Sequence, residues 1–225
     1  MSGLTRNLDF VFCIDGTESM AAIMDNVKTK LVELCEKTRT TILDSNENVG
    51  NMRAKLIVFR DYGVDKNPME VSDWFDLDPD FESLKSRLDI ITPTGGGDFH
   101  ENGLEALYLA LTSDFVIGPT DRQVVVLVSD ADALPMGERA SSPKYPSDMG
   151  SLDDLVDIWM GLFPDPPIKF QQYTRMLFFL APAKTAYEEL AILLGSGFYA
   201  LKQGEGIACD MGVLAKVIHA GHTVV

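Results

Sequence analysis

The sequence has few of the residues on which most zinc and disulfide sites depend. Its 225 residues include only three cysteines and three histidines. Cys13, Cys35 and Cys209 are an odd number and lack the paired spacing of a zinc motif. Cys13 lies inside an apolar stretch, where a thiol behaves as a small hydrophobic side chain. We therefore expect reduced, structural cysteines.

Basic residues are also scarce, with 19 Lys and Arg against 34 Asp and Glu and a formal net charge of −15. Nucleic acids and anionic membranes are bound through basic patches, and the sequence contains none. It also lacks an apolar run long enough for a membrane helix, and its first residues, MSGLTRNLD, lack the pattern of a secretory signal. We expect a cytoplasmic protein that binds neither nucleic acid nor membrane.

Strand-like and helix-like segments alternate along the chain. Apolar runs predict strands at residues 8–14, 54–62, 122–128, 175–181 and 197–202, with a short edge strand or hairpin arm at 70–76. Helical spacing predicts helices at residues 21–43, 101–112, 152–160, 185–194 and 211–220, and a short one at 78–91. This alternation predicts an α/β fold, a doubly wound, mostly parallel, Rossmann-like sheet with helices on both faces. We expect residues 1–225 to form a single domain.

Polar residues follow the first predicted strand at alternate positions, in the stretch LDFVFCIDGTESM. In an extended turn, residues two apart point the same way, so Asp15, Thr17 and Ser19 would converge. Ligand sites of doubly wound sheets lie at the carboxyl ends of strands, where these residues are expected. Their hard oxygen donors suit Mg²⁺, or Mn²⁺ and Ca²⁺. The alternative is a helix N-cap, because the same residue types are favoured there.

Two further strand-end loops carry acids. The glycine-rich stretch TPTGGGDFHENG contains Asp98 and Glu101, and VVVLVSDADA ends with Asp130 and Asp132. Either loop alone is explained by a flexible turn or another cap. Three acid-bearing loops at one sheet edge favour a cation site.

These motifs resemble the von Willebrand factor A domain, whose metal-ion-dependent adhesion site begins with Asp-x-Ser/Thr-x-Ser. The blocks FVFCIDGTESM, VFRDYG, GGGDFHENGLEAL, VVLVSDA and YPSDMGSLDDLVDIW extend the resemblance over nearly the whole chain. They look like a bacterial, intracellular subgroup, some members of which are encoded beside kinase-like and phosphatase-like proteins. The von Willebrand domains associated with alpha-kinases are similar.

The resemblance implies one divalent cation, Mg²⁺ or else Mn²⁺ or Ca²⁺, held by Asp15, Thr17, Ser19, Asp98, Glu101 and Asp130. Thr17 and Ser19 would give hydroxyl ligands, and Asp15 would hold the metal directly or through a water. Asp130 would close the site from the fourth strand.

The glycine-rich loop is similar to one in integrin beta subunits. The resemblance implies that Glu101 touches the metal and that Asp98 supports the loop or a neighbouring cation. His100 stands where many relatives have proline, and Thr92 or Thr94 could supply the ligand instead.

The resemblance further implies a binding module and not an enzyme. A partner protein's Asp or Glu would complete the metal shell, in an intracellular signalling or stress-response complex whose partners include kinase-like or phosphatase-like proteins. The rival hypothesis is a Mg²⁺-dependent phosphoryl hydrolase of the haloacid-dehalogenase type. The stretch IDGT matches the second half of that family's Asp-x-Asp-Gly-Thr motif. Cys13 occupies the position of that family's nucleophilic aspartate, which disfavours this hypothesis.

Overall fold

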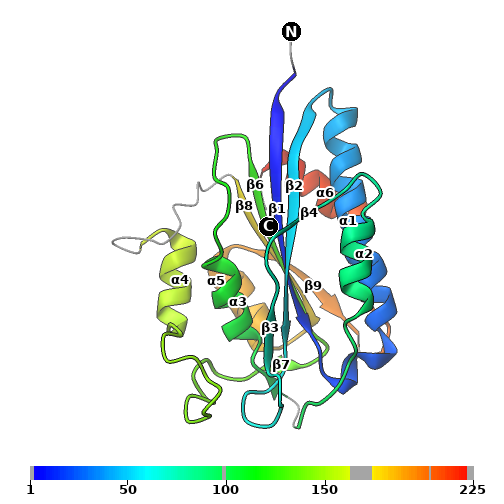
Figure 1. The fold of residues 1–225 in the computed structure, drawn as a ribbon. Coiled ribbons are helices and arrows are strands. Elements are labelled where there is room, and N and C mark those ends of the chain that lie inside the picture. Colours follow the sequence, from blue (N-terminus) through cyan, green and yellow to red (C-terminus); the bar gives the residue numbers. More distant parts are fainter. Residues whose placement is uncertain (1–2, 98–99, 163–173, 203, 222–225) are drawn as a thin grey trace.

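The structure, a computed structural model, describes residues 3–97, 100–162, 174–202 and 204–221 (Figure 1). Its main sheet has the strand order β3-β2-β1-β6-β8-β9, and β4 also pairs with β2. The parallel strands are β1 (Thr5–Asp15), β2 (Asn48–Phe59), β6 (Arg122–Val128), β8 (Arg175–Pro182) and β9 (Gly197–Leu201). Two short strands, β3 (Met69–Val71) and β4 (Phe75–Asp76), run antiparallel to β2 at one edge. The mostly parallel α/β sheet predicted from the sequence is confirmed.

The central strands are buried on both faces, which explains their nearly unbroken apolar sequences. Every residue of β6 is buried. Along β1, Phe10, Phe12 and Ile14 face one apolar core, whereas Val11 and Cys13 face the other. The sheet therefore separates two hydrophobic cores, each closed by helices.

Helices cover both faces of the sheet, as predicted (Figure 1). One core is closed by α1 (Met24–Asp44), α2 (Glu82–Asp89) and α6 (Met211–Ala220). The other is closed by α3 (Gly103–Leu111), α4 (Leu152–Met160) and α5 (Ala186–Leu194). In the described part of the chain, the helices are too short or too polar to cross a bilayer.

Helices α1 and α2 begin later than the sequence predicts. The 3₁₀ helix η1 (Glu18–Ala22) precedes α1, so the stretch predicted as one helix is divided at Ile23. The predicted helix at 78–91 is regular only from Glu82, because Phe81 has a left-handed φ of 57°. The Asp78 carboxylate still accepts hydrogen bonds from the first N–H groups of α2, at 2.9 Å each.

The largest correction concerns Glu101, which was predicted to begin a helix. It lies instead in the two-residue strand β5 (His100–Glu101), which pairs in parallel with β7 (Asp132–Ala133). The helix α3 starts only at Gly103. This pairing places the end of the glycine-rich loop beside the loop that follows β6.

Candidate metal centre

Two of the predicted ligand residues, Asp15 and Asp130, lie where the strand order reverses. β1 is flanked by β2 on one side and β6 on the other, and the chain leaves β1 and β6 at the same edge of the sheet. Asp15 is the last residue of β1, and Asp130 follows β6 by two residues. This switch point is where doubly wound sheets bind ligands.

Four side chains form a continuous chain of oxygen atoms at this edge. The Thr17 hydroxyl donates to Asp15 Oδ1 at 2.6 Å, and the Ser19 hydroxyl donates to Asp130 Oδ1 at 2.7 Å. Thr17 Oγ1 and Ser19 Oγ lie 3.0 Å apart. Residues 111 positions apart in the sequence therefore meet in one cluster.

The cluster has the donor chemistry that a hard cation needs. Each hydroxyl group has one proton to donate. When Thr17 donates its proton to Asp15 and Ser19 donates its proton to Asp130, the two hydroxyl oxygens face each other with their lone pairs. Their separation of 3.0 Å matches neighbouring oxygens of a Mg²⁺ octahedron, which lie about 3 Å apart when the metal–oxygen distance is about 2.1 Å. The residues present thus fit a divalent cation.

The helix-cap alternative does not describe these contacts. Thr17 is the N-cap residue of η1, yet its side chain makes no capping hydrogen bond. The long helix α1 begins after Ile23, whose side chain has no polar atom with which to cap. The polar side chains of the motif face each other and Asp130 instead of the helix.

Asp15 is completely buried and is held by three hydrogen bonds. Thr17 donates from both its backbone N–H, at 2.9 Å, and its hydroxyl, and Ser129 donates to the other carboxylate oxygen at 2.7 Å. Burial raises the pKa of Asp15 to about 6, although the hydrogen bonds from Ser129 and Thr17 oppose the rise. Ser129 was missed at the sequence level, although its position just before Asp130 at a strand end was the available signal.

This burial predicts a pH dependence for the metal-free protein. Below about pH 4 Asp15 is protonated in both folded and unfolded chains, whereas between about pH 4 and 6 only the folded chain keeps the proton. The free energy of unfolding should therefore fall as the pH rises through that window, by an amount on the order of 3 kcal/mol attributable to Asp15.

Urea unfolding in EDTA at pH 4, 5, 6 and 7 would measure this, with Asp15→Asn as the reference for all other titrating groups. The difference in free energy of unfolding between the two proteins should change between about pH 4 and 6. If this difference in free energy of unfolding were the same at every pH, burial would not raise the pKa of Asp15.

The glycine-rich loop approaches Thr17 through Gly96. Gly95 and Gly96 have φ values of 76° and 79°, a left-handed conformation that side chains disfavour. A Cβ atom on Gly96 would lie 3.0 Å from both Glu101 Oε1 and the Thr17 Cβ atom. The Glu101 carboxylate and the Thr17 side chain therefore both lie close to Gly96, and Glu101 is buried there.

The other predicted residues of this loop lie differently. Thr92 and Thr94 have exposed side chains, and their carbonyl groups accept hydrogen bonds from Arg60. Asp98 lies outside the described residues. Asp132 turns to α5, where its carboxylate accepts from the backbone N–H of Ala186 at 2.8 Å, and it makes no recorded bond to the oxygen cluster.

Arg60 joins the two site loops, and Asp65 holds the glycine-rich loop, neither of which the sequence revealed. The Arg60 Nε group donates to the carbonyls of Gly16 and Thr94, at 3.0 Å each. The Asp65 carboxylate accepts from the N–H of Gly96 at 3.2 Å. The short block VFRDYG contains Arg60 but not Asp65, and it does not indicate a partner for the arginine.

No group of three or more His, Cys, Asp or Glu side chains suited to a metal occurs within the described ranges. The candidate centre depends on two hydroxyls in addition to its acids. Cys13, the position of a nucleophile in the rival hypothesis, is fully buried and donates to the Ala106 carbonyl at 3.5 Å. Burial also raises the pKa of this thiol far above its ordinary value, which keeps it protonated.

No known family model matches this sequence, and no curated protein matches it either. Among solved structures, one described as von Willebrand factor type A from Catenulispora acidiphila is similar, with a TM-score of 0.47 and 11% identity over 97% of this chain. A pilus adhesin, SpaC from Lactobacillus rhamnosus GG, has a TM-score of 0.39 and 14% identity over 59% of this chain. The present chain spans 41% of the first protein and 15% of the second.

Proposed function

We propose that this chain is a protein-binding module of the von Willebrand factor A type that depends on a divalent cation, Mg²⁺ or else Mn²⁺ or Ca²⁺. The observation that carries the proposal is the pair of hydroxyl oxygens of Thr17 and Ser19. They lie 3.0 Å apart while each has a separate carboxylate to which it donates its proton. The geometry of this site supports the proposal, and the distant structural likenesses are not needed for it.

Each residue has a distinct role in the proposed centre. Thr17 and Ser19 offer lone pairs to the cation, while Asp15 and Asp130 accept their protons and fix their orientation. Both oxygens of Asp15 already accept hydrogen bonds, which favours an indirect role for this carboxylate. Glu101 is the preferred ligand from the glycine-rich loop, because it lies with Thr17 against Gly96 whereas Thr92 and Thr94 do not.

The bound cation would supply the positive charge that a partner's Asp or Glu meets. Without it, the acids of this edge would repel such a group. Following the resemblance, the proposed setting is an intracellular signalling or stress-response complex, with kinase-like or phosphatase-like proteins as candidate partners. We propose no catalytic role, because Cys13 is enclosed where the rival mechanism needs an aspartate.

The test is partner capture on the immobilised protein in Mg²⁺ or in EDTA, with Ser19→Ala and the exposed α2 variant Ser86→Ala as a matched pair. Retained partners should require both Mg²⁺ and Ser19. A double-mutant cycle between Ser19→Ala and truncation of the partner's carboxylate should be strongly non-additive, because each change removes the same bridge. Equal retention in EDTA, or additive losses, would contradict a metal bridge.

A further inference from the structure

The edge strand β3 leaves backbone hydrogen-bonding groups without partners. Arg60 N donates to the Pro68 carbonyl at 2.8 Å, and Ser72 N donates to the Leu56 carbonyl at 2.9 Å. These bonds set the alternation of the antiparallel ladder, so residues 68, 70 and 72 face β2. The N–H and C=O groups of Met69 and Val71 therefore point away from the sheet, and none of the recorded hydrogen bonds of the described residues reaches them.

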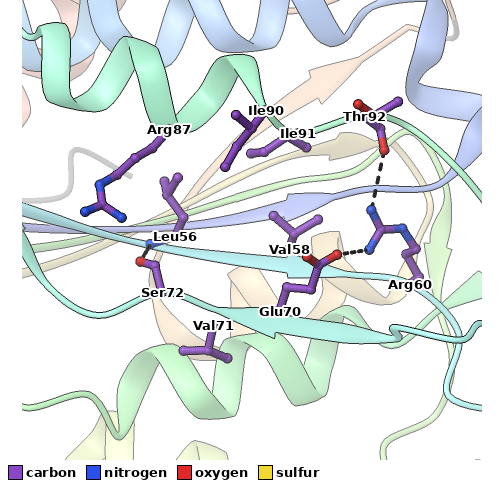
Figure 2. Close-up of a pocket in the computed structure, with 10 residues that line it drawn as sticks. All are labelled: Leu56, Val58, Arg60, Glu70, Val71, Ser72, Arg87, Ile90, Ile91 and Thr92. Atoms are coloured by element: carbon purple, nitrogen blue, oxygen red, sulfur yellow. Dashed lines mark hydrogen bonds and ion pairs between the residues drawn. The ribbon is translucent and has the colours of Figure 1, made fainter.

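A pocket lies on each face of this edge. Figure 2 shows the first, the α2-side pocket of about 390 Å³, between the β2–β3 pair and the end of α2. Its lining includes Leu56, Val58, Glu70, Arg87 and Ile91. The α3-side pocket has about 490 Å³, and its lining includes Tyr62, Lys66, Met69, Val71 and Leu109.

The two pockets follow from the register of the strands. Glu70 pairs with Val58, so both side chains lie on the α2 side, whereas Val71 pairs with Ile57 on the other face. A strand added outside β3 would also direct alternate side chains to the two faces. Its successive side chains would therefore enter the α2-side and α3-side pockets in turn.

The charges around the edge favour an acidic occupant. The Arg87 guanidinium lies 4.3 Å from the centre of the Phe75 ring and forms no ion pair with any residue in the described ranges. Lys66, in the α3-side pocket, is exposed and also has no recorded ion pair there. Arg60 differs, because it already pairs with Glu70 at 2.7 Å. In a chain with a net charge of −15, two available cations beside apolar pockets are a distinct chemical feature.

We propose that β3 binds an extended segment of a partner protein, with both apolar and acidic side chains on each of its two faces, by addition of a strand to the sheet edge. The Met69 and Val71 backbone would supply the new hydrogen bonds, and the two pockets would select the side chains. The short length of β3 and the charge of Glu70 limit pairing with arbitrary strands, while the pockets and cations admit this one class. This binding does not depend on the cation centre.

The probe is a fluorescein-labelled, eight-residue peptide with the repeat Val-Val-Glu-Glu, which puts both residue types on each face of a strand. This Glu–Val peptide is compared by fluorescence anisotropy with a Lys–Val peptide in which Lys replaces each Glu. Val71→Pro removes an outward N–H while retaining the bonds to β2 at residues 70 and 72, and Val71→Thr is its matched control. Reversing both edge cations in Arg87→Glu/Lys66→Glu is matched by Lys37→Glu/Lys216→Glu, which changes the net charge equally on exposed positions of α1 and α6. Thermal melts establish that each variant is folded.

We expect saturable binding of the Glu–Val peptide that EDTA does not alter. Val71→Pro and the edge-cation variant should each weaken it about tenfold or more, whereas both controls should bind as the unmodified protein does. Absence of saturable binding, equal binding of the Lys–Val peptide, or full binding by folded Val71→Pro would overturn the proposal. Concentration-dependent dimerisation that Val71→Pro abolishes would assign the edge to a second copy of the chain and would also overturn it.

Discussion

Replacement of Arg60 by methionine is expected to lower the free energy of unfolding by about 3 kcal/mol or more. The Arg60 side chain is almost fully buried, and it donates to four carbonyl groups and to Glu70. Methionine has a similar length but no donors, so these carbonyl groups would lose a shared partner within the fold. The loss should therefore exceed that of an exposed ion pair.

Urea unfolding at neutral pH would measure this loss, with Glu70→Gln as the control. The Glu70 side chain is 54% exposed, so breaking only its ion pair with Arg60 should cost less than about 1 kcal/mol. Arg60→Met should also weaken the cation response, because Arg60 connects Gly16 to Thr94 between the two site loops. Equal stability of Arg60→Met and the unmodified protein would show that these loops are held by other contacts.

Addition of millimolar Mg²⁺ or Mn²⁺ is expected to stabilise the folded chain by about 2.7 kcal/mol once the cation reaches a hundred times its dissociation constant. For a domain of this size, that corresponds to a rise of roughly 5–10 °C in the melting temperature. The reason is mass action, since the converging oxygens of Thr17, Ser19, Asp15 and Asp130 exist only in the folded chain.

Thermal melts with the cation and with EDTA would show the effect. Ser19→Ala removes one hydroxyl of the facing pair and should abolish most of the rise, whereas Ser86→Ala on α2 should retain it. Melts of the unmodified protein that do not change with Mg²⁺, Mn²⁺ or Ca²⁺ would leave the oxygen cluster as a purely structural hydrogen-bond network.

The local sequence was sufficient to predict the architecture. The alternation of apolar strands with amphipathic helices depends on burial, and burial leaves a periodic pattern in the residues themselves. The same reasoning located Asp15 and Asp130 at strand ends, because parallel strands end at one edge of the sheet. The architecture and the strand-end positions of these acids were both predictable because each depends on the pattern of residues that are close together in the sequence.

Tertiary structure decided the features that depend on residues far apart in the chain. Glu101 lies in a strand and not a helix because β5 pairs with β7, about 30 residues later, which local propensity cannot anticipate. Ser129 was missed because its partner, Asp15, is 114 residues away. The partners of Arg60 and Asp65 could not be identified from the sequence, since their hydrogen bonds to Gly16 and Gly96 form only after the sheet assembles.

The chemistry of the candidate centre shows the same division. Residue type defines donor chemistry, so the available oxygen-bearing residues could be identified without the folded structure. Only the folded structure decided that the Thr17 and Ser19 oxygens face each other while Asp132 turns to α5. It also decided that the β3 edge lies between two pockets, since Arg87 and Lys66 reach that edge from opposite faces of the sheet. Hydrogen-bond direction and strand register depend on contacts between distant segments, and a linear pattern does not contain them.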